Sequence, residues 1–221
     1  MKELSFTQEY LLCALSPKGT LPALRQTEMI TCLVAGGLLE LLYSGTISIN
    51  EEKKIVVLKE LDRSQAHLEP LYVILTNRKP LKVYDLAVKY VFSSHKLPDE
   101  FLRALCLPMV EQQVVSPETG GLFHNRPVYV PNQEAVRKTV EKIRAEFLEG
   151  GPIDDETLVL GALLQKSGLI KNYFSKYESD TLNRRIEEIK KSEAGSMIKK
   201  MIDYVDTLIA VMASVGSSAG S

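Results

Sequence analysis

The sequence predicts a mainly α-helical protein, with a single globular domain of about eight helices and two small β-hairpins. Hydrophobic residues make up 45% of the 221 residues and charged residues 25%, the usual composition of a chain that folds around its own core. Apolar residues recur at helical spacing along most of the chain, and two short segments alternate like paired strands. We expect the domain over residues 1–215 and a flexible Ser/Gly tail over 216–221.

The charge, the cysteines and the apolar runs of the sequence predict which environment the protein occupies. The 27 basic and 28 acidic residues leave a net charge of −1, so no overall field draws the chain to nucleic acid or to an anionic bilayer. Cys13, Cys32 and Cys106 lie in apolar segments, as buried reduced thiols of a cytoplasmic protein do. No apolar run reaches the roughly 20 residues that a membrane span needs, and the start of the chain lacks the pattern of a signal peptide.

The first half opens with a short helix and a long one. The short helix is expected over Ser5–Leu15, because apolar residues fall on overlapping helical spacings before Pro17. The segment Arg25–Tyr43 is almost continuously apolar and predicts a helix that is buried on most sides. Its Gly36-Gly37 pair costs roughly 1 kcal/mol per glycine in helix propensity, which indicates that another part of the chain packs closely there.

A hairpin follows the long helix. Gly45 sits where a left-handed helix cap is common, and Thr46–Ile49 and Lys54–Leu58 are expected as its two strands. The order of helix and hairpin over 29–58 is also that of a winged-helix DNA binder. The helix Leu33–Leu42 carries Glu40 as its one charge and offers no basic side chain to bases or phosphates, so we do not expect nucleic acid as a partner.

Further helices and a second hairpin are expected in the rest of the chain. The helices are expected at 70–77, 81–92, 99–115 (ended or interrupted near Pro108), 133–148, 154–167, 177–191 and 197–215. The second hairpin is expected with strands at Gly120–Phe123 and Val128–Val130. Asn132 and the acidic run Asp154–Glu156 are interpreted as N-terminal caps of the helices that follow them.

The sequence carries no motif for catalysis, nucleotide binding or metal binding. A phosphate loop, a GxGxxG turn, an HExxH pair and a CxxC are all missing, so we expect no enzyme activity, no cofactor and no metal. His67, His95 and His124 stand apart from any metal-ligand spacing and are interpreted as surface or loop residues. The mixed charges of Arg184-Arg185 and Lys190-Lys191 are interpreted as a solvated helix face.

Three segments together resemble the Golgi phosphoprotein 3 family. They are LSFTQEYLLCAL at the start, GGLLELLYSGTISI at the end of the long helix, and the hairpin that begins at Gly120. The family pattern at the second segment is matched by Leu38, Glu40, Leu41, Gly45 and Ile47. The resemblance covers Leu4 to about Val211 in the same order and looks like that of a prokaryotic relative.

The resemblance implies a function at a membrane surface. Members of the family are single helical domains that bind phosphatidylinositol 4-phosphate without catalysis, and the eukaryotic members also hold glycosyltransferase tails in the Golgi. The partners implied for this chain are an anionic phospholipid headgroup and a membrane surface, with the protein in the cytoplasm and peripheral on the membrane. In the family a tryptophan, an arginine and a later arginine pair grip the headgroup, because planar guanidinium groups match phosphate.

This gripping set is largely absent at the matched positions. The tryptophan position falls on Arg25, the first arginine position on Val34, and the arginine pair on Asp99 and Leu102, with Arg103 one step away. Arg25 and Arg103 are therefore the candidate phosphate-binding residues of this chain. The alternative is a protein-interaction scaffold of the same fold that has lost the lipid site.

The second hairpin is the other candidate site that the resemblance implies. In the family this hairpin promotes self-association and can touch the bilayer. Leu122, Phe123 and Val128 are the residues expected to build a homo-oligomer or to contact the membrane here.

Overall fold

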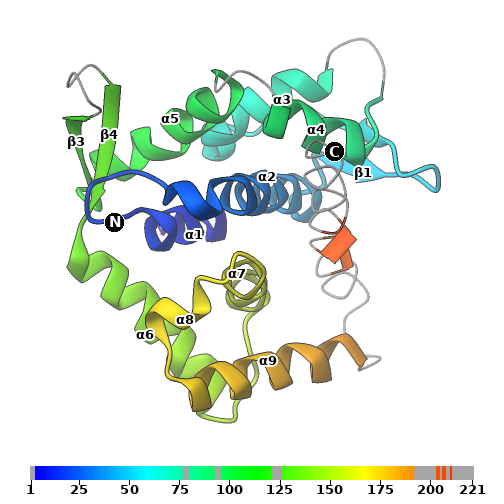
Figure 1. The fold of residues 1–221 in the computed structure, drawn as a ribbon. Coiled ribbons are helices and arrows are strands. Elements are labelled where there is room, and N and C mark those ends of the chain that lie inside the picture. Colours follow the sequence, from blue (N-terminus) through cyan, green and yellow to red (C-terminus); the bar gives the residue numbers. More distant parts are fainter. Residues whose placement is uncertain are drawn as a thin grey trace, which may run out of the picture.

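Helix α2 (Gln26–Tyr43) runs through the middle of the computed structural model, and the other helices are arranged around it (Figure 1). The structure describes residues 3–76, 80–92, 96–120, 126–191, and 203, 204, 206, 207 and 210. One continuous hydrophobic cluster draws on helices from both halves of the chain.

Within these residues the chain forms nine α-helices, two 3-10 helices and two antiparallel hairpins, which confirms the predicted fold class. Besides α2, the helices are α1 Phe6–Ala14, η1 Ala23–Arg25, η2 Arg63–Leu68, α3 Glu69–Thr76, α4 Val83–Phe92, α5 Lys96–Glu111, α6 Gln133–Leu148, α7 Asp155–Lys166, α8 Ile170–Tyr173 and α9 Lys176–Lys191. The strands are β1 Ile47–Ile49, β2 Ile55–Val57, β3 Val115–Gly120 and β4 Arg126–Pro131.

The first helix is short and is buried along its whole length. Ser5 and Gln8 form a capping box at its N-terminus, in which each side chain bonds to the other residue's backbone N–H. The carboxylate of Glu40, on α2, accepts a further hydrogen bond from the backbone N–H of Thr7 at 3.0 Å. Three side chains therefore accept hydrogen bonds from backbone N–H groups that a helix N-terminus otherwise leaves free.

Every residue of α2 from Met29 to Leu41 is buried, as the sequence predicted. A Cβ on Gly36 would lie 2.7 Å from Oγ1 of Thr7, and one on Gly37 would lie 2.8 Å from Leu71 and 2.9 Å from Phe101. The glycine pair thus lets α1 approach one side of α2 while α3 and α5 approach another, which confirms the close packing predicted for it.

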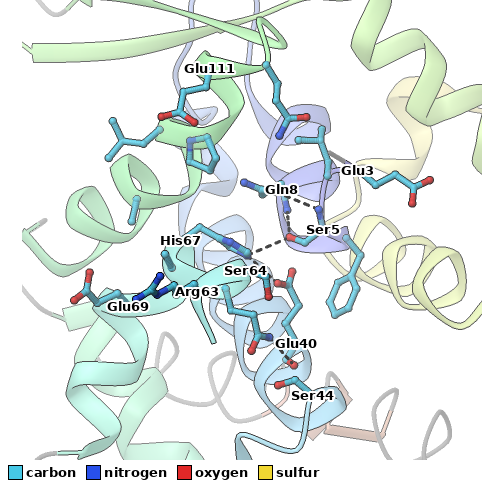
Figure 2. A pocket seen from close by; sticks show the side chains of 18 of the residues that line it. Glu3, Ser5, Gln8, Glu40, Ser44, Arg63, Ser64, His67, Glu69 and Glu111 are labelled. Atoms are coloured by element: carbon cyan, nitrogen blue, oxygen red, sulfur yellow. Dashed lines mark hydrogen bonds and ion pairs between the residues drawn. The ribbon is translucent and has the colours of Figure 1, made fainter. Parts of the chain in front are cut away.

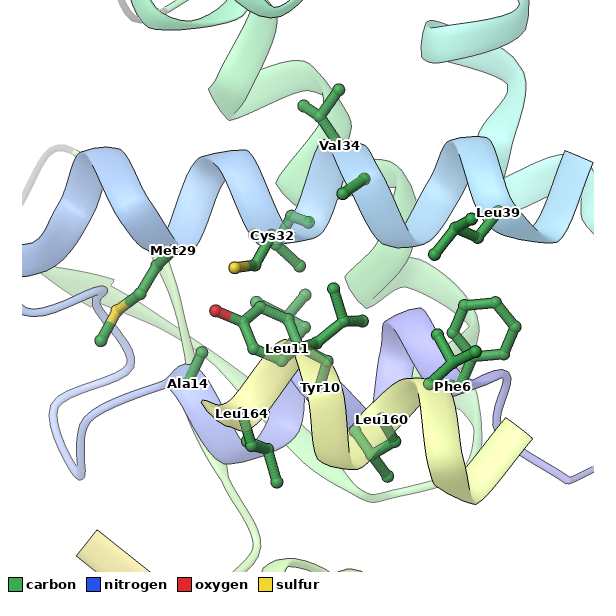
Figure 3. Packing of buried hydrophobic residues seen from close by; sticks show 14 of the residues in the cluster. Phe6, Tyr10, Leu11, Ala14, Met29, Cys32, Val34, Leu39, Leu160 and Leu164 are labelled. Carbon is green, nitrogen blue, oxygen red and sulfur yellow. The ribbon is translucent and has the colours of Figure 1, made fainter. Parts of the chain in front are cut away.

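The centre of the core lies between α1, α2 and α7 (Figure 3). Tyr10 of α1 is fully buried beside Cys32 of α2, and burial raises the pKa of its hydroxyl well above the usual value. The three cysteines are buried and unpaired, as predicted. They therefore serve as small apolar side chains in the core.

The first hairpin pairs Ile47 with Val57 and Ile49 with Ile55, close to the predicted strands. The second hairpin begins earlier than predicted, because β3 covers Val115–Gly120 and only Gly120 of the expected strand Gly120–Phe123 lies among the described residues. Four successive residues of β3 are exposed, so its burial does not alternate and gave no signal in the sequence. Residues 121–125, which include Leu122 and Phe123, lie outside the described residues.

Two helices also differ from the predicted pattern. Helix α5 continues through Pro108, where the sequence predicted a break, because Leu105, Cys106 and Met109 on either side of it are held in the core. The four-residue helix α8 was not predicted. The two caps were predicted correctly: Asn132 accepts bonds from the first turn of α6, and Asp154 from that of α7.

Helices α6 and α7 pack against α1, and α9 packs against both of them. Helix α6 contacts α1, α7 and α9. Arg185 on α9 is half-buried and donates to the carbonyls of Glu146, Phe147 and Gly151 at the end of α6. Its predicted role on a solvated face is therefore wrong, since it caps a neighbouring helix. The helix expected at 197–215 and the tail at 216–221 lie almost entirely outside the described residues.

Replacing Gly37 tests the packing around α2. We expect Gly37→Ala to lower the free energy of unfolding by about 1–2 kcal/mol, because overpacking outweighs the gain in helix propensity. Urea unfolding followed by circular dichroism measures the change. Gly151→Ala, where a Cβ meets nothing within 4 Å, is the control and should change little. An alanine at position 37 that stabilises the protein would contradict the close packing.

Candidate functional site

The loop between α1 and α2 packs against the second hairpin. The backbone N–H of Tyr129, in β4, donates to the carbonyl of Gly19 at 3.2 Å, and the two segments lie side by side in Figure 1. A hollow of about 400 Å³ lies between them, and Lys18, Glu118 and Val128 are among its lining residues. We call residues 16–25 together with β3 and β4 the loop–hairpin surface.

Arg25 is exposed at the end of this loop, where η1 meets α2. Its Nη1 donates to the carbonyl of Ser167 at 3.2 Å. Within the described part of the chain, the guanidinium makes no other hydrogen bond or ion pair. The neighbouring side chain, Leu24, is 98% exposed. An arginine with free donors and a solvent-exposed leucine therefore stand together at the start of α2.

Arg103 borders the same surface from α5. Its side chain is exposed, and among the described residues it has no hydrogen-bond or ion-pair partner. Burial raises the pKa of Tyr129 above its usual value, and the nearby positive charge of Arg103 partly opposes this rise. Arg103 thus lies close to β4, the strand that is bonded to the loop leading to Arg25.

The other positions matched to the family's gripping set cannot hold a phosphate. Val34 is 1% exposed and lies in the core. A side chain at this position therefore does not reach the solvent, where a ligand would bind. Asp99 is exposed but carries the wrong charge, and Leu102 packs partly against the core. Arg25 and Arg103 remain as the candidates that the sequence named.

Val128 has a structural role in the hairpin. It is 8% exposed, and its Cγ1 would lie 2.7 Å from a Cβ placed on Gly120 across the strand pair. Its contribution to self-association or membrane contact, like that of Leu122 and Phe123, stays a prediction.

A larger cleft lies elsewhere, between the start of α1, the end of α2, η2 and α5 (Figure 2). Its volume is about 780 Å³, and neither Arg25 nor Arg103 lines it. Its ionisable lining residues are Glu3, Glu40, Glu69, Glu111, Glu156, Arg63 and His67. Five carboxylates against two basic groups make this cleft unfavourable for a phosphate.

Ser5, His67 and Glu40 meet in the wall of this cleft, but their geometry is not that of a catalytic triad. Nε2 of His67 lies 2.9 Å from Oε2 of Glu40 and 3.4 Å from Oγ of Ser5. In a triad the carboxylate and the serine bond to different ring nitrogens, so that the acid orients the base. Here both contacts use Nε2, so the arrangement serves to hold η2 against α1 and α2.

His67 was predicted to be a surface or loop residue, and this prediction is wrong. Its side chain is 8% exposed and that of Glu40 is 6% exposed. No local sequence pattern indicated this contact, because the two residues are 27 positions apart and on different helices. His95 and His124 lie outside the described residues.

The carboxylates near the cleft repel one another. Burial raises the pKa of Glu156, repulsion from Asp154, Glu40 and Glu3 raises it further, and Lys142 opposes the rise. The two surfaces therefore differ in their ionisable side chains: the cleft is lined mainly by carboxylates, while the loop–hairpin surface carries Lys18 and Arg25 and is bordered by Arg103.

Sequence reasoning missed three residues of the loop–hairpin surface and its surroundings. Lys18 and Leu24 lie in a segment whose Pro17, Gly19 and Pro22 already indicated an exposed loop, so that signal could have found them. Gly168, which lies beneath the guanidinium of Arg25, had no such signal because it is distant in the chain.

The helix that would serve as the recognition helix of a winged-helix protein is buried in this structure. Helix α2, which precedes the first hairpin, is enclosed by α1, α3, α4 and α7, and it has no free face to enter a groove of DNA.

Among the described helices, none is both long enough and apolar enough to span a lipid bilayer.

The fold and its surfaces define a helical domain with one acidic cleft and one basic, partly apolar surface. A model of the Golgi phosphoprotein 3 (GPP34) family matches residues 7–205, and the chain belongs to this family. The match confirms the family that the sequence resembles. No curated protein is significantly similar to the chain.

Replacing Glu40 tests its role in joining α1, α2 and η2. We expect Glu40→Ala to lower the free energy of unfolding by about 2–3 kcal/mol, because the N–H of Thr7 and the ring of His67 both lose a buried charged partner. Thermal or urea unfolding measures the change. Glu69→Ala, at an exposed carboxylate of the same cleft, should change stability by less than about 0.5 kcal/mol. Equal effects of the two substitutions would refute this role for Glu40.

Proposed function

We propose that the protein is a non-catalytic module that binds an anionic phospholipid headgroup of the phosphatidylinositol 4-phosphate type through its loop–hairpin surface. The observation that carries the proposal is Arg25, an exposed residue beside the 98% exposed Leu24, whose guanidinium makes a single hydrogen bond within the described part of the chain. The protein would then act in the cytoplasm as a peripheral membrane protein.

The chemistry of arginine supports a phosphate as the ligand. A guanidinium has five N–H donors in one plane and binds phosphate through two parallel hydrogen bonds. Arg25 uses one nitrogen toward Ser167, so its other donors are available to a ligand. It also stands at the N-terminus of the 18-residue helix α2, where the helix dipole favours an anion.

The neighbouring charges support a membrane surface as the source of the phosphate. Lys18 is exposed on this surface and Arg103 is exposed at its border, and each basic residue near an anionic bilayer contributes roughly 1 kcal/mol of attraction. Glu28 and Glu118 are nearby carboxylates that reduce this field, so the surface favours a headgroup held at short range. Family membership supports the same ligand class.

Leu24 would supply the apolar contribution to membrane binding. A leucine that inserts among the acyl chains adds roughly 0.8 kcal/mol for each buried methylene group. A surface that combines one such residue with basic residues binds membranes reversibly, as a peripheral protein does.

A second candidate is a protein-interaction scaffold that has kept the fold and lost the lipid site. The burial of Val34 favours it, since this matched position of the gripping set lies in the core. In that case the protein would act through partners or through a homo-oligomer built by the second hairpin. A wild-type chain that ignores anionic vesicles even at low salt would favour the scaffold.

The arginine contribution is tested by cosedimentation with vesicles that contain phosphatidylinositol 4-phosphate. We expect Arg25→Ala and Arg103→Ala each to weaken binding about fivefold, because each removes a phosphate-directed charge. Binding by the wild-type chain should weaken as ionic strength rises from about 0.05 M to about 0.5 M.

Arg184→Ala is the matched control, because Arg184 is an exposed arginine on α9, away from the loop–hairpin surface. It should leave vesicle binding unchanged. If it weakens binding as much as Arg25→Ala does, the attraction depends on total charge alone and the proposed surface is wrong.

The apolar contribution of Leu24 gives a separate prediction. Leu24→Ser should weaken vesicle binding about fivefold without changing its dependence on salt, because it removes buried apolar area and no charge. The stability of the protein should not change, since the side chain has no packing to lose. Leu58→Ser, at another exposed leucine, is the control. A loss of salt dependence in Leu24→Ser would count against membrane insertion.

A further inference from the structure

Gly168 lies in contact with the guanidinium of Arg25, although the two residues are far apart in the sequence. Gly168 follows the end of α7 and has φ +70°, the left-handed conformation common after a helix. A Cβ at this position would overlap Nη1 of Arg25 and would lie 3.0 Å from its Cζ. The absence of a side chain at Gly168 therefore leaves the room that the guanidinium occupies.

The end of α7 also holds the guanidinium by a hydrogen bond. The carbonyl of Ser167 accepts from Nη1 of Arg25 at 3.2 Å. The last carbonyls of a helix carry partial negative charge, which favours a cation there. Ser167 is itself fixed, because it is 3% exposed and its hydroxyl donates to the carbonyl of Leu163 at 2.9 Å. The acceptor of Arg25 is thus a rigid part of the core.

We propose that Gly168 is a positioning residue for the phosphate site, because it lets the end of α7 hold Arg25 in one orientation with its remaining donors toward solvent. The inference rests on the function proposed above and adds a specific residue to it. A free arginine side chain loses roughly 0.5–1.5 kcal/mol of conformational entropy when a ligand fixes it. An arginine that is already held avoids most of that loss.

Gly45 shows that the left-handed conformation alone does not explain this arrangement. It follows α2 at the same position of the cap and has φ +69°, but a Cβ there would meet nothing within 4 Å. Alanine at either glycine suffers the same backbone strain, and only alanine at 168 displaces Arg25. Gly45→Ala is therefore a closely matched control.

The experiment measures binding to vesicles with phosphatidylinositol 4-phosphate for the wild type, Gly168→Ala, Gly45→Ala, Arg25→Ala and the two double variants that contain Arg25→Ala. We expect Gly168→Ala to bind about 3- to 10-fold more weakly than the wild type, the range set by the ordering cost of one side chain. Gly45→Ala should bind as the wild type does. Adding Gly168→Ala to Arg25→Ala should have no further effect, because the side chain it displaces is gone.

A second variant at position 168 separates loss of binding from loss of folding. Gly168→Asn keeps a Cβ at the same place, while asparagine tolerates the left-handed conformation better than alanine does. It should show the same loss of binding with less loss of stability. Thermal unfolding of each variant separates the two effects.

The outcomes are distinct for the two proposals. If the wild type does not bind these vesicles, the proposed function fails. If the wild type binds and Gly168→Ala matches Gly45→Ala, the positioning role is overturned while the function stands. Tighter binding by Gly168→Ala also overturns it, because the end of α7 would then restrain Arg25 from its ligand. The positioning role is also overturned if Gly168→Ala weakens vesicle binding by the same factor in the wild type and in Arg25→Ala.

Discussion

The close approach of α1, α3 and α5 to Gly36 and Gly37 is the constraint on which the rest of the structure depends. Because α2 has no side chain at these two positions, helices pack on it from different sides, and the residues around it form one continuous core. Both surfaces described above are set at the ends of this arrangement. The loop–hairpin surface lies where α2 begins, and the acidic cleft lies where it ends. The central helix therefore holds two regions of opposite charge apart.

This separation gives the protein two different kinds of surface. The acidic cleft is lined by five glutamates together with apolar side chains such as Leu107 and Pro108. Its Ser5, His67 and Glu40 are linked through a single nitrogen. The loop–hairpin surface combines basic side chains with an exposed leucine, which is the composition that a lipid surface recognises. The charge is local, because the whole chain is nearly neutral. Under the proposed function, this surface would orient the molecule on a membrane, while the rest of the protein would add little attraction.

Much of the fold could be predicted from the sequence, because α2, α6 and α7 carry signals that are local. Their apolar spacing and the caps Asn132 and Asp154 lie within a few residues of the helices they define. The errors arise where tertiary contacts overrule such signals. Core packing carries α5 through Pro108, and β3 lacks alternation because most of it faces solvent. The candidate site was predicted only in part, since Arg25 can be named from the sequence while its contacts with Ser167 and Gly168 depend on how α7 folds back.

The bond from Glu40 to the N–H of Thr7 also orders events during synthesis of the chain. A nine-residue helix such as α1 is too short to be stable alone in water. The carboxylate that completes its N-terminus lies 33 residues later, so α1 cannot reach its final state until most of α2 has left the ribosome. The apolar face of α1 is then exposed for the time needed to translate that interval. The folding of α1 is therefore coupled to that of a helix whose end lies more than 30 residues further along the chain.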